Sequence, residues 1–248
     1  MTESQDQTIA NSLTRDILTG RYSPGDRLPS ERELAARLNV SRGAVREAIK
    51  RLEMLGIADV QPGGARVAPV EEASLDVIGH LLELEAAPDP DLVDQILQVM
   101  TALMAFATET AVVNGTDAQL AEIRRLVQQL KGSVVRRVDD VVTRFEVMRA
   151  VMEASANLVI RLIARALLIQ FVPRLARVVP ADELALQYPD HYVEHLDALD
   201  LAIAERNPAA ARRAVVAMSA FDIELAMAEL ARAQAQTDTV AQSMESAS

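Results

Sequence analysis

The sequence predicts a mainly α-helical protein with two parts: an N-terminal winged helix-turn-helix and a C-terminal all-α bundle of six or seven helices. Residues 30–55 have the pattern of two short helices joined by a tight turn, and residues 57–68 that of a small β-hairpin. After residue 71, apolar side chains recur at helical spacing and no strand-like alternation is present. We therefore expect a first domain at residues 1–70, with the linker at residues 69–72, and a helical domain at residues 71–234.

The helix-turn-helix is predicted from its capping residues. A first helix at residues 8–19 precedes it and ends at Gly20. Ser30 can cap the next helix, and Glu33 can complete a capping box three residues later. Residues 39–41 interrupt the apolar pattern, and Ser41 is a suitable N-cap for a helix that ends near Leu55. Apolar side chains form the inner faces of these two helices: Leu34, Ala35, Leu38, Val45, Ala48, Ile49, Leu52 and Leu55.

The outward face of the second of these helices is basic. Arg42, Arg46 and Lys50 are spaced four residues apart and form one exposed stripe. A helix with a polar N-terminus and cations along its outer face suits the major groove of DNA. A generic helical domain with solvated arginines is the alternative, because charged stripes are often only that. The hairpin of residues 57–68, which would be a wing, favours DNA binding.

Residues 8–69 resemble the winged-helix domain of GntR-family transcription regulators, most closely the FadR branch. The resemblance rests on GRYSPGDRLPSERELAARLNVSRGAVREAIKRLEMLGI and on the hairpin QPGGARV. By position, it implies DNA contacts at Arg32, Ser41, Arg42 and Arg46, with Gly63 at the wing tip in the minor groove. Arg32 is expected to contact phosphate, and Arg42 and Arg46 are candidates for guanine edges.

Charge and composition narrow the function classes. Residues 1–70 hold 10 Lys and Arg against 9 Asp and Glu, a net of +1, while the rest hold 15 against 27, a net of −12. The acidic part should repel DNA, so two functions on two domains are expected. Cysteine is absent, which excludes disulfides and thiolate chemistry. We expect a soluble cytoplasmic protein with no membrane partner, because no apolar run is judged long enough to span a bilayer.

The helical domain is expected to be built from seven long segments. Its breaks are placed at prolines and at the Asn114–Gly115 and Gly132–Ser133 pairs, and the small, polar residues 235–248 are expected to be a disordered tail. The expected helices cover residues 72–85, 91–113, 117–131, 134–155, 158–172, 190–205 and 208–234. With only 3% aromatic residues, the core must be aliphatic side chains and methionine.

This domain is similar to the FCD-like helical bundle that accompanies FadR-type DNA-binding domains, through RFEVMRAVMEASAN, HLDALDLAIAERNPAAA and the long last helix. In many such bundles an aspartate and three histidines hold a metal. The resemblance places those ligands at Val142, Glu146, Leu196 and Met218, of which only Glu146 could coordinate, so no metal or other cofactor is expected. An arginine and a glutamate that often frame the ligand correspond to Met100 and Met104.

These replacements predict an apolar cavity. A flexible thioether lining suits irregular apolar ligands, so we expect a lipid-like effector, with a fatty acyl-CoA as the leading candidate. Arg149 could hold its anionic head group, as could Arg161, or either could pair with an acid. The alternative carries equal weight: methionines at helical spacing usually fill a core.

One motif suggests an enzyme. His191, Glu194 and His195 match the HxxEH spacing of a zinc hydrolase helix. The pattern is short, a third ligand cannot be located, and exposed residues at a helix start are the simpler interpretation. The chain also has no GxSxG, P-loop or GxGxxG motif. A metal-dependent hydrolase is therefore an unfavoured alternative.

Taken together, these patterns predict a ligand-responsive transcriptional regulator, and a repressor in particular. One recognition helix contacts too few base pairs to specify a single site in a genome. A homodimer on a palindromic operator of double-stranded DNA is therefore expected. An architectural DNA-binding protein without an effector is the alternative from a different class. It would bind DNA regardless of any metabolite.

Overall fold

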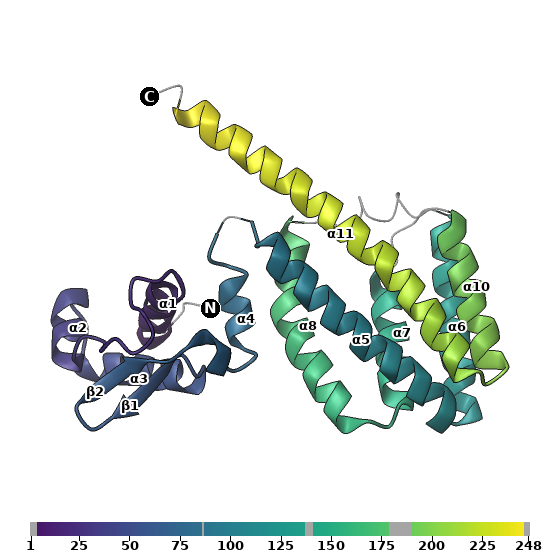
Figure 1. Ribbon diagram of the computed structural model, residues 1–248, viewed down its shortest axis with the longest axis horizontal. Coiled ribbons are helices and arrows are strands. Elements are labelled where there is room, and N and C mark those ends of the chain that lie inside the picture. Colours follow the sequence, from purple (N-terminus) through teal and green to yellow (C-terminus); the bar gives the residue numbers. More distant parts are fainter. Residues whose placement is uncertain (1–3, 86, 137–140, 179–189, 246–248) are drawn as a thin grey trace. The chain divides into compact units, whose positions relative to one another are not determined.

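The computed structural model describes residues 4–85, 87–136, 141–178 and 190–245, and confirms the predicted fold class (Figure 1). The chain forms two compact units, Met1–Ala86 and Ala87–Ser248. The sequence places the linker at residues 69–72, whereas the first unit extends past it to Ala86. The reason is that a short helix, α4 (Val77–Leu81), packs against the first helix of the chain and buries Val77 in the same core.

Over its described residues, the first unit contains four α-helices, one short 3-10 helix and a two-stranded hairpin. Its remaining elements are α1 (Gln5–Leu18), α2 (Glu31–Leu38), α3 (Arg42–Met54), β1 (Ala58–Gln61), β2 (Gly64–Val67) and the short 3-10 helix η1 (Val70–Glu72). Leu13, Leu34 and Leu52 are almost completely buried at its centre. Residues 72–85 were expected to be one helix, but η1 ends at Glu72 and the α-helix in this range is only the short α4.

The turn between α2 and α3 forms as its sequence predicts. The Ser30 hydroxyl accepts a bond from the Glu33 amide at 3.3 Å, and the Glu33 carboxylate accepts one from the Ser30 amide at 2.8 Å, which completes the capping box. Asn39 ends α2 in the left-handed region at φ 52°, which asparagine tolerates. The Ser41 hydroxyl then accepts from the Ala44 amide at 3.1 Å and starts α3.

The hairpin has a two-residue loop. β1 and β2 pair antiparallel from Ala58 opposite Val67 to Gln61 opposite Gly64, so Pro62 and Gly63 form the turn. Gly63 has φ 109°, a conformation that glycine adopts without strain. Ala65 and Val67 face the core while Arg66 faces solvent, the alternation expected of a half-buried strand.

The second unit is a bundle of six helices over its described residues: α5 (Pro90–Asn114), α6 (Asp117–Val135), α7 (Val141–Ala154), α8 (Leu158–Val178), α10 (Asp190–Ala204) and α11 (Pro208–Glu245). Helix α5 lies along α11 and also packs against α7 and α8, while α6 packs against α7 and α10 (Figure 1). The core is mainly aliphatic, as its composition predicts, and the aromatic side chains of Tyr192 and Phe171 are also buried in the bundle, at 0% and 3% exposure.

One expectation about α5 is wrong. It is the one helix of the described residues long and apolar enough to cross a membrane by length and composition, whereas no segment was expected to reach that length. Residues of α5 such as Val93, Ala107 and Ala111 lie in the bundle core or against it. A core helix of a soluble bundle passes the same test, so this property alone is weak evidence for a membrane segment.

Three helices run further than their breaking residues suggest. Helix α6 continues through Gly132 and Ser133. The Ser133 hydroxyl donates a hydrogen bond to the Gln129 carbonyl one turn earlier, at 3.3 Å. Helix α8 continues through Pro173, although a proline has no amide hydrogen to bond to the Ile169 carbonyl. Both residues are exposed, so water can take the place of the missing donor. Helix α11 continues to Glu245, past residue 234 where a polar tail was expected to begin.

Candidate DNA-binding surface and helical-domain core

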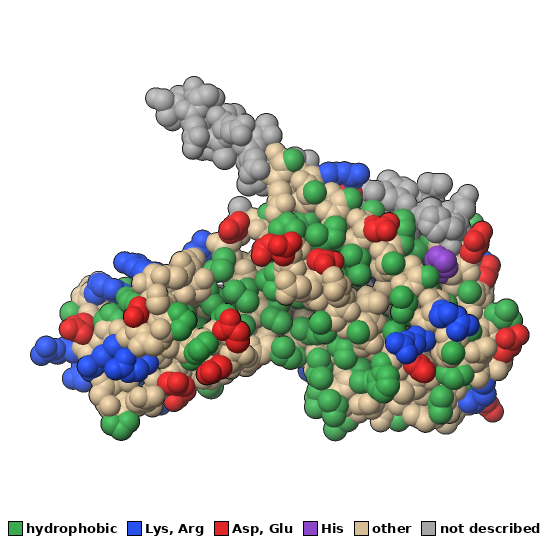
Figure 2. Space-filling model, in the orientation of Figure 1, with side chains coloured by type: hydrophobic (Ala, Val, Ile, Leu, Met, Phe, Trp, Pro, Cys, Tyr) green, Lys and Arg blue, Asp and Glu red, His purple; other side chains and the backbone are tan. Residues whose placement is uncertain are grey.

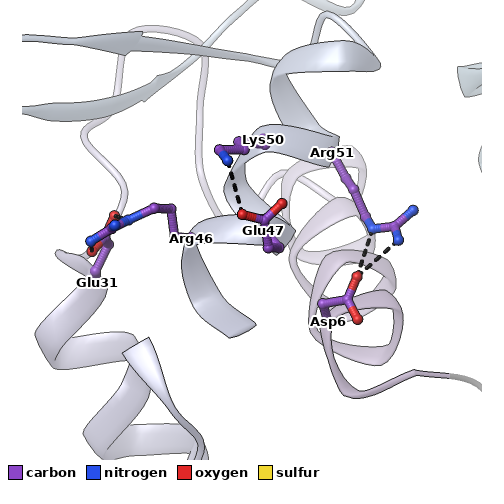
Figure 3. A network of polar contacts seen from close by, with 6 residues as sticks. All are labelled: Asp6, Glu31, Arg46, Glu47, Lys50 and Arg51. Atoms are coloured by element: carbon purple, nitrogen blue, oxygen red, sulfur yellow. Dashed lines mark hydrogen bonds and ion pairs between the residues drawn. The ribbon is translucent and has the colours of Figure 1, made fainter. Parts of the chain in front are cut away.

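The N-terminal half of α3 presents the predicted basic stripe. The side chains of Arg42 and Arg46 are 64% and 57% exposed, one turn apart, directly after the N-cap Ser41. Lys50 continues the stripe but binds Glu47 at 2.8 Å on the same helix (Figure 3). The opposite face of α3, including Val45 and Leu52, is fully buried. Core packing therefore fixes which face of α3 is turned to solvent, and that face is basic.

A carboxylate lies beside these two arginines. Glu31, the first residue of α2, accepts two hydrogen bonds from Arg46 (Figure 3), at 3.0 Å from Nε and 3.1 Å from Nη2. The Glu31 carboxylate also lies 3.8 Å from Arg42 Nη2. The hydrogen bond from Arg46 lowers the pKa of Glu31, and the Glu31 carboxylate in turn raises the pKa of Arg46. Exposed pairs of this kind are weak, so DNA can compete for both guanidinium groups.

The role of Glu31 is not recognisable from the sequence. Its pairing with Arg46 spans 15 residues and depends on the angle between α2 and α3, which no local pattern reports. The neighbouring Arg32, a predicted phosphate contact, is exposed in the first turn of α2. At the far side of α3, Arg51 binds Asp6 of α1 at 2.8 Å, and this ion pair joins the two helices (Figure 3).

Two arginines hold the wing. Arg27, in the loop before α2, donates from Nη2 to the Gly63 carbonyl at the hairpin tip, and Arg66 of β2 donates to the Gly25 carbonyl at 2.8 Å. A Cβ atom added to Gly64 would lie 3.1 Å from Arg27 Nε. At Gly63, no atom lies within 4 Å of such a Cβ, so the tip is open to a ligand. The role of Arg27, like that of Glu31, is not recognisable from the sequence.

The residues predicted to bind an effector do not all converge in the structure. Leu196 is fully buried, and Met104 and Met218 pack against the same core cluster. Met100 and Glu146 are half-buried. Val142 is 70% exposed and lies outside that core cluster, and Arg149 is exposed and paired with Glu153 at 2.8 Å. The structure therefore gathers three of the seven residues around one core.

A polar cluster joins α7, α10 and α11 inside the bundle. Arg144 donates to the Tyr192 hydroxyl at 3.0 Å and pairs with Asp222 at 3.4 Å, and the Tyr192 hydroxyl also donates to Asp222 at 3.4 Å. Burial, more than the nearby Asp222 charge, raises the pKa of Tyr192. This cluster is not recognisable from the sequence, because its members are 30 to 78 residues apart.

The HxxEH motif gains no support from the structure. The His191 side chain lies outside the described residues, while Glu194 is exposed and His195 is half-buried on α10. Among the residues that the structure describes, no group of three or more His, Cys, Asp or Glu side chains is placed to hold a metal ion.

A winged helix with an exposed basic recognition face, followed by an all-helical unit, defines a two-domain DNA-binding regulator. Comparison with known proteins identifies its family. Residues 5–67 match the bacterial regulatory proteins of the gntR family, and residues 95–220 match the FCD domain. The chain therefore belongs to the GntR family of transcription regulators, with an FCD effector domain. Members of this family are DNA-binding regulators rather than enzymes.

Individual relatives support this assignment. The HTH-type transcriptional regulator Mce2R of Mycobacterium tuberculosis is 30% identical over 215 residues, which cover 84% of this chain and 85% of that protein. The fatty acid metabolism regulator protein of Shewanella halifaxensis is 31% identical over 116 residues, 46% of this chain and 48% of that protein. Among solved structures, Lar, which controls the Listeria monocytogenes agr system, aligns with a TM-score of 0.54 over 94% of this chain and 99% of that chain; its 19% identity shows the fold alone.

Proposed function

We propose that this regulator is a homodimeric, ligand-responsive repressor that acts in the cytoplasm on a palindromic operator. The observation that carries the proposal is the solvent-facing pair Arg42 and Arg46 at the start of α3. A single α3 helix contacts only a few base pairs, so binding to one specific DNA site requires two copies of the chain. Two copies related by a two-fold axis read a sequence that has the same symmetry.

Each residue of the surface has a proposed role. Arg42 and Arg46 bind guanine edges, because a guanidinium can donate to both acceptors of that base. Arg32 binds a phosphate. The Ser41 hydroxyl accepts from the Ala44 amide and can still donate its own proton to a phosphate oxygen. Gly63, open on its outer side, enters the minor groove with the wing.

We further propose that the helical domain binds a lipid-like effector such as a fatty acyl-CoA. Half-buried Met104 and Met218 against an aliphatic core supply adaptable apolar surface, and Glu146 alone among the four expected metal positions could coordinate a metal. The name of the Shewanella relative, a fatty acid metabolism regulator, points the same way. Effector binding would shift the population between two arrangements of the DNA-binding domains and relieve repression.

Two experiments test this proposal. Selection from a randomised duplex library should enrich a short palindrome. Enrichment of a non-palindromic site would contradict the proposal that a two-fold symmetric dimer binds the operator. In thermal unfolding with a series of acyl-CoAs and free fatty acids, the compounds with long acyl chains should raise the Tm. In a DNA-binding assay, the same compounds should release the selected duplex. DNA binding that none of these compounds alters would instead support the architectural alternative.

A further inference from the structure

The segment that leads from the wing to the helical domain is docked on the first unit. The Ser74 amide donates a hydrogen bond to the Leu55 carbonyl at the end of α3, at 2.9 Å. Helix α4 then lies beside α1 (Figure 1), and its residue Val77 is only 5% exposed in the core of the first unit. We call residues 73–84 the docked linker. Its path is set by the DNA-binding domain, although it leads to the other unit.

The docked linker begins against Gly56. At φ 73°, Gly56 has a backbone conformation that residues with a side chain rarely adopt. A Cβ atom added there would lie 3.0 Å from the Ala73 Cα atom and 3.0 Å from the Glu72 carbonyl oxygen, tighter than most such contacts. The glycine therefore lets two backbone segments pack directly against each other. This contact holds the start of the docked linker close to the end of α3, the helix that carries the recognition arginines.

Arg15 of α1 holds the other end of the docked linker. Its Nη1 atom donates to the Glu83 carbonyl at 3.4 Å, and its Nη2 atom donates to the Leu84 carbonyl at 2.5 Å. Both carbonyls follow the end of α4, a place where arginine side chains commonly bind backbone oxygens. Leu84 lies two residues before the end of the first unit. Arg15 therefore holds the chain close to the point where it leaves the DNA-binding domain.

The contact with two carbonyls requires the geometry of arginine. A guanidinium group is planar and presents its N–H groups side by side, so it can donate to two neighbouring carbonyls, whereas a lysine ammonium is a single point charge. The backbone of Arg15 is fixed, because Leu13 and Ile17 of α1 are buried in the core. Arg15 itself is exposed, so its replacement should not disturb that core. It thus ties the end of the docked linker to a rigid helix.

We infer that Arg15 is a positioning residue for operator binding. By holding Glu83 and Leu84, it fixes where the chain leaves the DNA-binding domain, and so limits the half-site spacings that two copies can bind together. The inference rests on the proposed homodimer and its palindromic operator. One added base pair moves a half-site by about 3.4 Å and turns it by about 35° around the DNA axis. A fixed exit point resists that movement, whereas a loose one permits it.

Operators with altered spacing test the inference. The selected palindrome is lengthened at its centre by one or two base pairs, and binding of the full chain is measured by fluorescence anisotropy. The added base pairs should weaken binding of the wild type roughly 100-fold, because both half-sites can no longer be bound at once. For Arg15→Ala the loss should be about 10-fold or less, because the freed linker can follow the second half-site. Both proteins should bind a duplex with a single half-site equally well.

Arg21→Ala is the matched control. Lys and Arg side chains gather on the first unit in Figure 2, so the loss of any of them reduces the attraction to DNA. Arg21 pairs with Asp16 of α1 at 3.2 Å rather than with the docked linker. Its replacement removes the same charge from the same domain and leaves the contacts of Arg15 in place. The loss of affinity with spacing should therefore equal that of the wild type.

Hydrogen exchange detects the Arg15 contact without DNA. The amides of Leu82 and Glu83 donate to the carbonyls of Ile78 and His80, so their exchange reports how often the end of α4 opens. Arg15→Ala should speed this exchange by about 5-fold or more, because hydrogen bonds from a charged group are lost. The amides of α3 should exchange at the wild-type rate.

The outcomes separate this inference from the proposed function. If the lengthened operators weaken Arg15→Ala as much as the wild type, or if the end of α4 exchanges unchanged, the positioning role is overturned while the homodimer stands. Equal broadening in Arg21→Ala would overturn it as well, as would a loss of single half-site binding in Arg15→Ala, which would show that Arg15 only stabilises the domain. A wild type that binds every spacing equally would contradict the proposed two-fold operator itself.

Discussion

Neutralising Glu31 should strengthen non-specific binding to DNA. In the free protein its carboxylate bonds to Arg46 at 3.0 and 3.1 Å and lies 3.8 Å from Arg42, so it offsets part of the positive charge that a phosphate would meet. Glu31→Gln removes that charge but keeps the shape of the side chain. We expect a several-fold gain in affinity for a random duplex at low salt.

The salt dependence gives this prediction its magnitude. If the change frees one guanidinium to neutralise one more phosphate, the slope of log K against log salt should steepen by about 0.9. A fourfold increase in salt should then shrink the gain in affinity by about 3.5-fold. Preference for the selected operator should fall, because Glu31 no longer restricts where the two arginines point.

Fluorescence anisotropy of a labelled random duplex, titrated at several salt concentrations, measures both quantities. Glu53→Gln is the matched control, since Glu53 is an exposed acid at the far end of α3, and the substitution removes the same charge. If Glu31→Gln gains no more affinity than Glu53→Gln and has the same slope, the idea that Glu31 masks the arginines is refuted.

Three further predictions concern single residues. Arg32→Ala should weaken operator and random duplexes alike and make the salt slope shallower by about 0.9, measured by the same anisotropy titration. Arg27→Ala should abolish hydroxyl-radical protection in the minor groove but leave guanine N7 protection unchanged, because only the Gly63 tip loses its tether. Tyr192 has a raised pKa, so its contribution to stability is complete below about pH 10 and is lost as pH rises through the folded-state value. Urea unfolding of Tyr192→Phe should therefore depend less on pH above 10 than that of the wild type; equal slopes would contradict the buried phenol.

Local sequence predicted the features that local interactions determine. The capping box of Ser30 and Glu33 and the N-cap at Ser41 depend on residues three apart, and the basic stripe depends only on helical spacing. The break expected at Pro173 was wrong: a proline removes one backbone hydrogen bond and usually kinks or ends a helix, but α8 continues through Pro173 at an exposed position, where water can bind the carbonyl left without a partner. That condition depends on burial, which the sequence pattern does not report.

Contacts between distant elements were not predictable in this way. Arg27 reaches the wing across 36 residues, and Arg144 meets Asp222 across 78. Both contacts depend on how elements far apart in the sequence come together: a loop and the hairpin in the first case, and two helices of the bundle in the second. The same limit applies to the predicted effector residues, which were placed by the family resemblance: Met104, Leu196 and Met218 lie in or against one core, whereas Val142 is exposed on α7.

The central claim is that Arg42 and Arg46 read bases in duplex DNA. The most direct test compares the wild type with Arg42→Ala/Arg46→Ala on the selected operator and on a scrambled duplex of equal length. The wild type should prefer the operator by at least about 1,000-fold, and the double variant should fold normally, keep weak binding to both duplexes and lose that preference. An operator preference that survives the loss of both guanidinium groups would contradict the account.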